Sequence, residues 1–196
     1  PMKQNSTSLT RKRPVYNLVL AAMFLALGII LPFFTGQIPQ IGNMLLPMHL
    51  PVFLCGLICG WPYGLAVGLV LPLLRHLLFA MPPLISAVPM AFELAAYGGI
   101  VGFLYGRSSW QCVIALYRSL LVAMVVGRVV WAAVRMVMIG VVQVPFSLEI
   151  FLAEGFVQAI PGIILQLVVI PVVMVALDRT GMVRFHRHAP ELADDV

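Results

Sequence analysis

Residues 114–142 read IALYRSLLVAMVVGRVVWAAVRMVMIGVV, an apolar run that carries arginine at positions 128 and 135 in its interior. About 20 predominantly apolar residues in a helix cross the hydrocarbon core of a bilayer, so this run is long enough to span a membrane. Because it is longer than the bilayer requires, it must tilt or project. A charge near the centre of a spanning helix costs about 2.5–3.5 kcal/mol or more on insertion scales. Both arginines therefore need a partner or a ligand.

The composition of the whole chain agrees with a membrane location. Hydrophobic residues make up 62% of the sequence and charged residues only 10%, whereas the charged share of a soluble domain is about 25%. The apolar runs are long and show no alternation of period two, which favours helices over a β-barrel. The predicted fold class is an all-α integral membrane protein.

Proline, glycine and polar residues divide the apolar sequence into six expected spans within a single membrane domain covering residues 1–196. The predicted spans are 16–34, 47–60, 63–80, 88–106, 114–142 and 150–178. Basic residues are enriched in cytoplasmic segments of membrane proteins. Of the 12 Lys and Arg residues, all but three precede the first span, flank the fourth connection or follow the last span. We therefore expect a six-transmembrane-helix bundle with both termini in the cytoplasm.

This topology places the remaining intramembrane charges in the outer half of the membrane. Arg75 lies near the outer end of the third span, and Glu93 lies in the outer half of the fourth span. Helical spacing puts Tyr97 on the same face as Glu93, and it puts Trp131 on one face with the two arginines of the fifth span. A polar pocket that opens outward under the loops 35–46 and 143–149 is the hypothesis. The alternative is that Glu93 and Glu154 neutralise two arginines as structural pairs.

Motif searches find no enzyme signature in the chain. The sequence contains no G-x-S-x-G, no H-E-x-x-H and no Walker A motif. We therefore expect no intrinsic ATPase and no cofactor. Cys55 and Cys59 have a spacing that could share a metal ion, but no histidine or acidic residue adjoins them, so a packing role is favoured. The basic residues are explained by membrane topology, which argues against a nucleic-acid partner.

The chain resembles the substrate-specific S component of energy-coupling factor (ECF) vitamin transporters. The resemblance rests on LGIILPFFTGQIPQIGNMLLPMHLPVFLCGLICGWPYGLAVGLVLPLLR from Leu27 to Arg75, and on MAFELAAYG from Met90 to Gly98. In addition, Ala22 and Ala26 resemble the family's AxxxA surface for docking on the membrane coupling (T) subunit. The resemblance implies capture of a water-soluble vitamin or related micronutrient outside a prokaryotic plasma membrane. Release inside would follow toppling of the protein with the T subunit and two ATP-binding cassette ATPases.

The resemblance also selects candidate residues, because the family binds ligand with the loop after the first span and with the last three spans. The predicted substrate-binding residues are Gln40, Asn43, Glu93, Tyr97, Arg128, Trp131, Arg135 and Gln158. Arg75 and His49 are expected to support the site, while Tyr97 and Trp131 could offer flat apolar faces. No metal site is expected.

The identity of the ligand stays open among several classes. Two arginines on one face suit a carboxylate or a phosphate, so a pantothenate-like anion is favoured. Pyridoxal-type vitamers, hydroxymethylpyrimidine and queuosine precursors are alternatives. A stand-alone secondary transporter is a further alternative, and a membrane-embedded enzyme or redox subunit would need a metal or haem.

Overall fold

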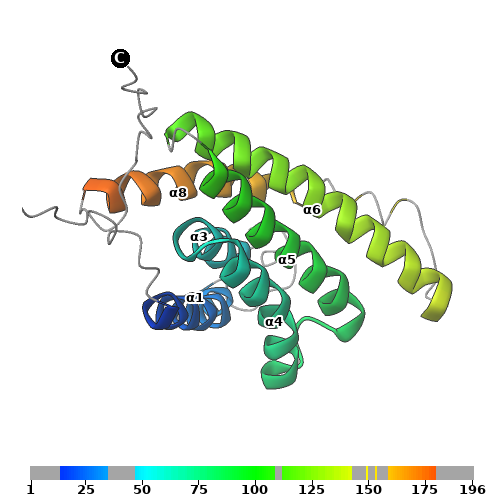
Figure 1. Ribbon diagram of the computed structural model, residues 1–196. Coiled ribbons are helices and arrows are strands. Elements are labelled where there is room, and N and C mark those ends of the chain that lie inside the picture. The colour runs from blue at the N-terminus through cyan, green and yellow to red at the C-terminus, as the bar shows by residue number, and fades with distance from the viewer. Residues whose placement is uncertain are drawn as a thin grey trace, which may run out of the picture.

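The computed structural model describes residues 14–34, 47–108, 112–142 and 159–179, together with positions 149 and 153. Regular structure in these ranges is helical, which confirms the predicted all-α class (Figure 1). The six helices are α1 (Pro14–Phe34), α3 (His49–Cys59), α4 (Trp61–Phe79), α5 (Leu84–Arg107), α6 (Val113–Val142) and α8 (Ile160–Arg179).

Five of these helices, all except α3, are long and apolar enough to cross a membrane. Helix α3 has 11 residues, which at 1.5 Å per residue reach about half of a hydrocarbon core of about 30 Å. The expected span 47–60 is therefore too short as a helix to cross the bilayer by itself. It ends at Gly60, whose φ of 98° lies in the left-handed region that glycine adopts without strain.

Helix α5 lies at the centre of the structure, packed against α3, α4 and α6 (Figure 1). Helix α1 covers α3 and α4, and α8 lies beside α3 and α6. One apolar cluster joins α3, α5, α6 and α8, and it includes Phe53, Tyr97, Met124 and Ile170. A second cluster joins α1, α3, α4 and α5. The central helix thus contributes to both cores.

Glycine contacts bring α3, α4 and α5 together. A Cβ atom added at Gly64 would lie 2.6 Å from both the Gly56 Cα atom and the Gly98 carbonyl oxygen. Small residues permit such close approach of helix backbones. The regular spacing of Gly56, Gly60, Gly64 and Gly68 suggests close packing of the second and third spans, and the structure adds α5 to this contact. Gly60 differs from the other three glycines because it forms the turn between α3 and α4.

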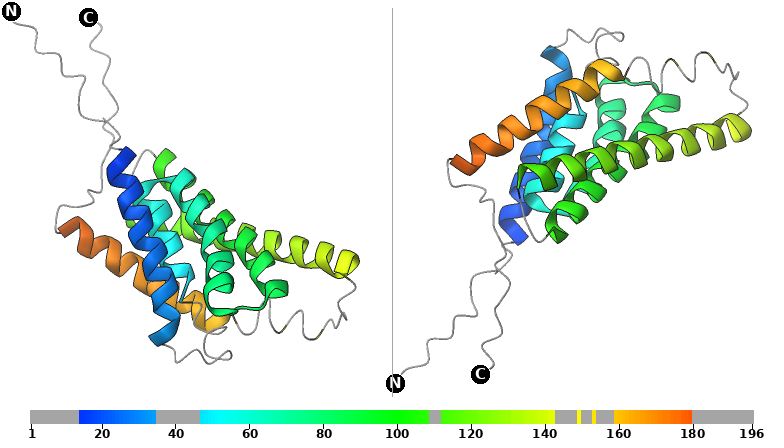
Figure 2. Two further views of the ribbon diagram at one scale, coloured as in Figure 1. Left: turned by 90° about the horizontal axis from the view of Figure 1, so that it is seen from below. Right: turned by 90° about the horizontal axis from the view of Figure 1, so that it is seen from above.

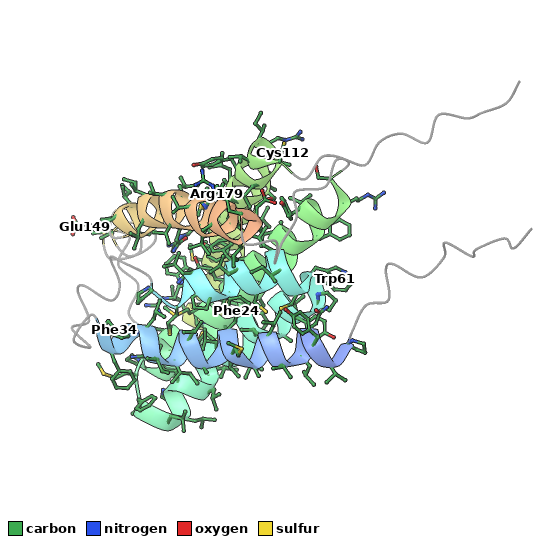
Figure 3. The ribbon with its side chains drawn as sticks, turned by 90° about the vertical axis from the view of Figure 1, so that its left-hand side faces the viewer. Phe24, Phe34, Trp61, Cys112, Glu149 and Arg179 are labelled. Carbon is green, nitrogen blue, oxygen red and sulfur yellow. The ribbon has the colours of Figure 1, made fainter. Side chains whose placement is uncertain are left out.

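The connections fall at two opposite ends of the molecule. Phe34 and Glu149 lie toward one end, and Trp61 and Cys112 lie toward the other (Figure 3). The connections expected outside and those expected inside are therefore separated in space. The end near Phe34 is the one toward which the candidate site must open if the predicted orientation holds.

Candidate ligand-binding site

A buried ion pair between α5 and α6 forms the centre of the candidate site. Arg128 Nη1 lies 3.2 Å from Glu93 Oε1. The Tyr97 hydroxyl, one helical turn from Glu93, donates a hydrogen bond of 2.7 Å to the same oxygen. Glu93 is only 2% exposed, and a buried carboxylate requires such partners. The structure thus brings together three of the residues that the sequence predicts for the site.

The Tyr97 ring is enclosed by its neighbours. It stacks on Phe53 with ring centroids 4.9 Å apart and an interplanar angle of 24°, and the His49 ring lies 5.5 Å away. On α6, a Cβ atom added at Gly127 would collide with the Tyr97 ring. The absence of a side chain at Gly127 therefore lets Tyr97 pack against α6. Tyr97 acts through its hydroxyl group, and its ring is not an open stacking face.

Two donors of Arg128 are buried without a hydrogen-bond partner among the residues that the structure describes. Nε and Nη2 make no hydrogen bond within the described part of the chain, whereas Nη1 contacts Glu93. The Nε2 atom of Gln166 on α8 is also buried without a hydrogen bond to the described residues, and this residue is 1% exposed. A buried donor without an acceptor costs about 1–3 kcal/mol. These three donors are the groups in the site that most need an acceptor.

We define the polar layer as the four contacting residues His49, Glu93, Tyr97 and Arg128, together with the buried Gln166 of α8. The layer borders the apolar cluster that joins α3, α5, α6 and α8. Phe53 follows His49 by one turn, Met124 precedes Arg128 by one turn, and Ile170 follows Gln166 by one turn. Since α6 runs opposite to α3 and α8, these single turns all lead from the cluster toward the same end of the molecule (Figure 2).

Arg135 and Trp131 lie farther along α6. Arg135 Nη1 donates a hydrogen bond of 3.2 Å to the Ile85 carbonyl oxygen near the start of α5. Trp131 is 9% exposed. Arg128 and Arg135 therefore both reach α5, as their shared helix face predicts, but they contact it at different levels.

Arg75 fastens α1 to α4 and does not pair with Glu93. It is 4% exposed, and its Nη1 donates a hydrogen bond of 3.0 Å to the Ile29 carbonyl oxygen. The guanidinium carbon lies 5.6 Å from the Phe33 ring centroid and 6.0 Å from that of Phe79, within the range of cation–π attraction. The sequence leaves two supporting roles open for Arg75, bracing of the loop after the first span or pairing with Glu93. The observed contacts are instead with α1 and α4, and the loop lies outside the described residues.

Ala22 and Ala26, predicted to dock on the coupling subunit, are both exposed on α1. The buried residues of this helix, Ala21, Gly28 and Pro32, lie on its other face. Three predicted binding residues, Gln40, Asn43 and Gln158, lie outside the described residues.

The structure adds Gly127 to the site, and it draws attention to Gln166, which the sequence places near the middle of the last span without selecting it as a binding residue. Gln166 had a detectable signal, because it is the one amide side chain within α8 and shares a helix face with Ile170. Gly127 had none, since glycine is frequent in membrane helices and its partner, Tyr97, lies on another helix.

Comparison with known families identifies one match. The family model described as "ECF transporter, substrate-specific component" matches residues 16–175. No curated protein and no solved structure matches the chain.

Proposed function

The chain belongs to the family of ECF transporter substrate-specific components, and from this premise we propose that it captures a water-soluble vitamin or related micronutrient outside the cell. The match confirms the resemblance noted in the sequence. With five helices long and apolar enough to cross a membrane, the chain is a multi-pass membrane protein. In this proposal the polar layer binds the ligand, and the membrane is the plasma membrane of a prokaryote.

The observation that carries the proposal is the half-satisfied guanidinium of Arg128. One terminal nitrogen contacts Glu93, and the other two nitrogens are buried without an acceptor within the described helices. An ion pair with a purely structural role would need only Nη1. Burial of the other two donors would then cost free energy with no hydrogen bond to offset it. A ligand with an anionic group would satisfy them, which favours a pantothenate-like anion over a cationic vitamin.

Energy for transport would come from partners. Members of this family are substrate-binding membrane subunits, and the ATPase is a separate partner module. We propose that the Ala22–Ala26 face of α1 docks on the membrane coupling subunit, because small residues permit close helix contact. Two ATP-binding cassette ATPases would complete the assembly, and toppling would deliver the ligand inward.

A thermal-shift screen of the purified chain against water-soluble vitamins tests the proposal. Ligand that binds only the folded state raises the unfolding temperature by mass action. We expect one vitamin or precursor to raise the unfolding temperature at low micromolar concentration and to remain bound in native mass spectrometry. A chain that responds to no member of the panel would contradict the proposal.

Co-purification separates the coupled transporter from the stand-alone one. The proposal predicts that the chain co-purifies with ATPase subunits and that uptake stops when they are deleted. Uptake that continues without any ATPase would favour a secondary transporter.

A further inference from the structure

We infer that the ligand is a monocarboxylate, and that its carboxylate is received jointly by the Nε–Nη2 edge of Arg128 and by the amide of Gln166. The inference rests on the proposed function, and it adds the chemical class of the recognised group and one binding residue, Gln166. It follows from three observations: the edge of the Arg128 guanidinium that has no acceptor among the described residues, the position of Gln166 on the same side of the apolar cluster, and the charge of Glu93.

The free edge of Arg128 has the geometry of a carboxylate receptor. In a guanidinium, the Nε–H group and one terminal N–H group point the same way and form a fork that matches two carboxylate oxygens. Glu93 contacts the other terminal nitrogen, Nη1, at 3.2 Å. Nε and Nη2 are the two buried atoms that lack an acceptor in the described part of the chain. The Glu93–Tyr97 pair therefore holds the guanidinium through Nη1 and leaves the Nε and Nη2 donors for a ligand.

Gln166, on α8, lies on the same side of the apolar cluster as Arg128. Ile170 on α8 and Met124 on α6 belong to one apolar cluster. Gln166 precedes Ile170 by one turn, and Arg128 follows Met124 by one turn. Helices α6 and α8 run in opposite directions (Figure 1), so both steps lead to the same side of the cluster. The Gln166 Nε2 atom, buried and without an acceptor in the described residues, therefore lies on the same side of the cluster as the Arg128 fork, and the inference assigns both to one carboxylate.

The charge of the polar layer favours a carboxylate over a phosphate. Glu93 neutralises the guanidinium that it contacts, and Gln166 adds a donor without adding charge. A phosphate monoester carries a charge of about −1.5 to −2 at pH 7, and it would place this charge beside the Glu93 carboxylate. A monocarboxylate adds a single charge and needs only the two donors of the fork plus one further donor. The donor set matches the smaller anion.

A ligand series on the purified full-length chain tests the chemical class. The probes are pantothenate, its alcohol analogue pantothenol, biotin, nicotinate, pyridoxal 5′-phosphate, thiamin and riboflavin, measured by isothermal titration calorimetry. We expect tight binding of one carboxylate, and an affinity for its alcohol or amide analogue that is lower by about tenfold or more, as expected for the loss of charge-assisted hydrogen bonds.

Two variants test the residues. Gln166→Leu removes a buried donor that lacks an acceptor among the described residues, so it should leave the unfolding temperature of the ligand-free protein unchanged or raise it, while carboxylate affinity falls about tenfold. If Gln166 had only a packing role, its replacement would not lower carboxylate affinity while leaving the unfolding temperature unchanged or higher. Arg128→Lys keeps the charge beside Glu93 but removes the fork, and it should also weaken binding. Arg118→Lys, at an exposed position of the same helix, is the matched control.

The outcomes distinguish the inference from the proposed function. Tight binding of a ligand without a carboxylate, or of the phosphate ester, would overturn the inference and leave the proposed function standing. The inference would likewise be overturned if a carboxylate bound with equal affinity to the wild type, Gln166→Leu and Arg128→Lys. If no probe bound the wild-type chain, both the inference and the proposed function would be contradicted.

Discussion

Tyr97 connects the ion pair to the apolar core at the scale of single residues. Its hydroxyl donates to Glu93 Oε1, and its ring stacks on Phe53. One side chain therefore fixes the carboxylate that orients Arg128. In this account Tyr97 and Glu93 are positioning residues, and Arg128 contacts the ligand together with Gln166.

Replacing Tyr97 by phenylalanine should test this positioning role. The variant keeps the stacked ring and leaves the Glu93 carboxylate with one partner fewer, which should lower stability by about 1–3 kcal/mol. We also expect weaker ligand binding, because Arg128 loses a fixed partner. Thermal unfolding and calorimetric titration measure the two effects, and an unchanged unfolding temperature together with unchanged affinity would contradict the role.

Gly127 offers a second test, with a matched control on the same helix. An alanine Cβ at this position would collide with the Tyr97 ring, whereas one at Gly140 would meet no atom within 4 Å. Overpacking of a core costs about 1–3 kcal/mol. Gly127→Ala should therefore destabilise the protein and weaken binding, while Gly140→Ala should do neither. Equal thermal stability of the two variants would show that the Tyr97 ring moves aside without cost, which would contradict the prediction.

At the scale of elements, α5 is the helix on which the others are assembled. Gly98 lies at its contact with α3 and α4, where an added Cβ would overlap with the backbone of Gly64. Gly106 is on the same helix, and an added Cβ there would meet nothing within 4 Å. The contrast between these two glycines provides an internal control.

Gly98→Ala should therefore separate α4 from α5 and lower the unfolding temperature by much more than Gly106→Ala. Backbone atoms cannot move aside as a flexible side chain can, so the cost should reach at least the upper part of the range of about 1–3 kcal/mol for overpacking. Differential scanning fluorimetry in detergent measures both variants. If Gly106→Ala were the more damaging change, the assignment of this contact would be wrong.

The outer surface of α1 belongs to the same scale. Ala22→Trp combined with Ala26→Trp should leave ligand affinity unchanged, because both positions are exposed and lie apart from the polar layer. Uptake should fall, since bulky side chains prevent close contact with the coupling subunit. Ala66→Trp, at an exposed position of α4, is the control. Normal uptake by the double variant would contradict docking through this face.

At the scale of the whole molecule, the sequence predicts the class of fold well and the site in part. Long apolar runs predict the five helices that can cross a membrane, and the spacing of Glu93 and Tyr97 predicts their shared face. The sequence also places the end of the second span at residue 60, where the structure has the turn at Gly60. The apolar run 47–60 was nevertheless counted as a span, although the helix α3 within it has only 11 residues.

Contacts between helices explain what the sequence could not predict in the site. The choice of Arg128 rather than Arg75 as the partner of Glu93 depends on which helix packs against α5 at that level. The enclosure of the Tyr97 ring likewise depends on Phe53 and Gly127, which lie on two other helices. Periodicity reports the faces of one helix, and it carries no information about the depth at which two helices meet.

The central claim is that the charged pair of Glu93 and Arg128 organises ligand binding. The most direct test is the ligand affinity of the double variant Glu93→Gln with Arg128→Gln, which removes both charges together and so leaves no buried charge unpaired. Native mass spectrometry against the vitamin that binds the wild type should show a folded double variant without bound ligand. A folded double variant that binds this vitamin as tightly as the wild type would contradict the account.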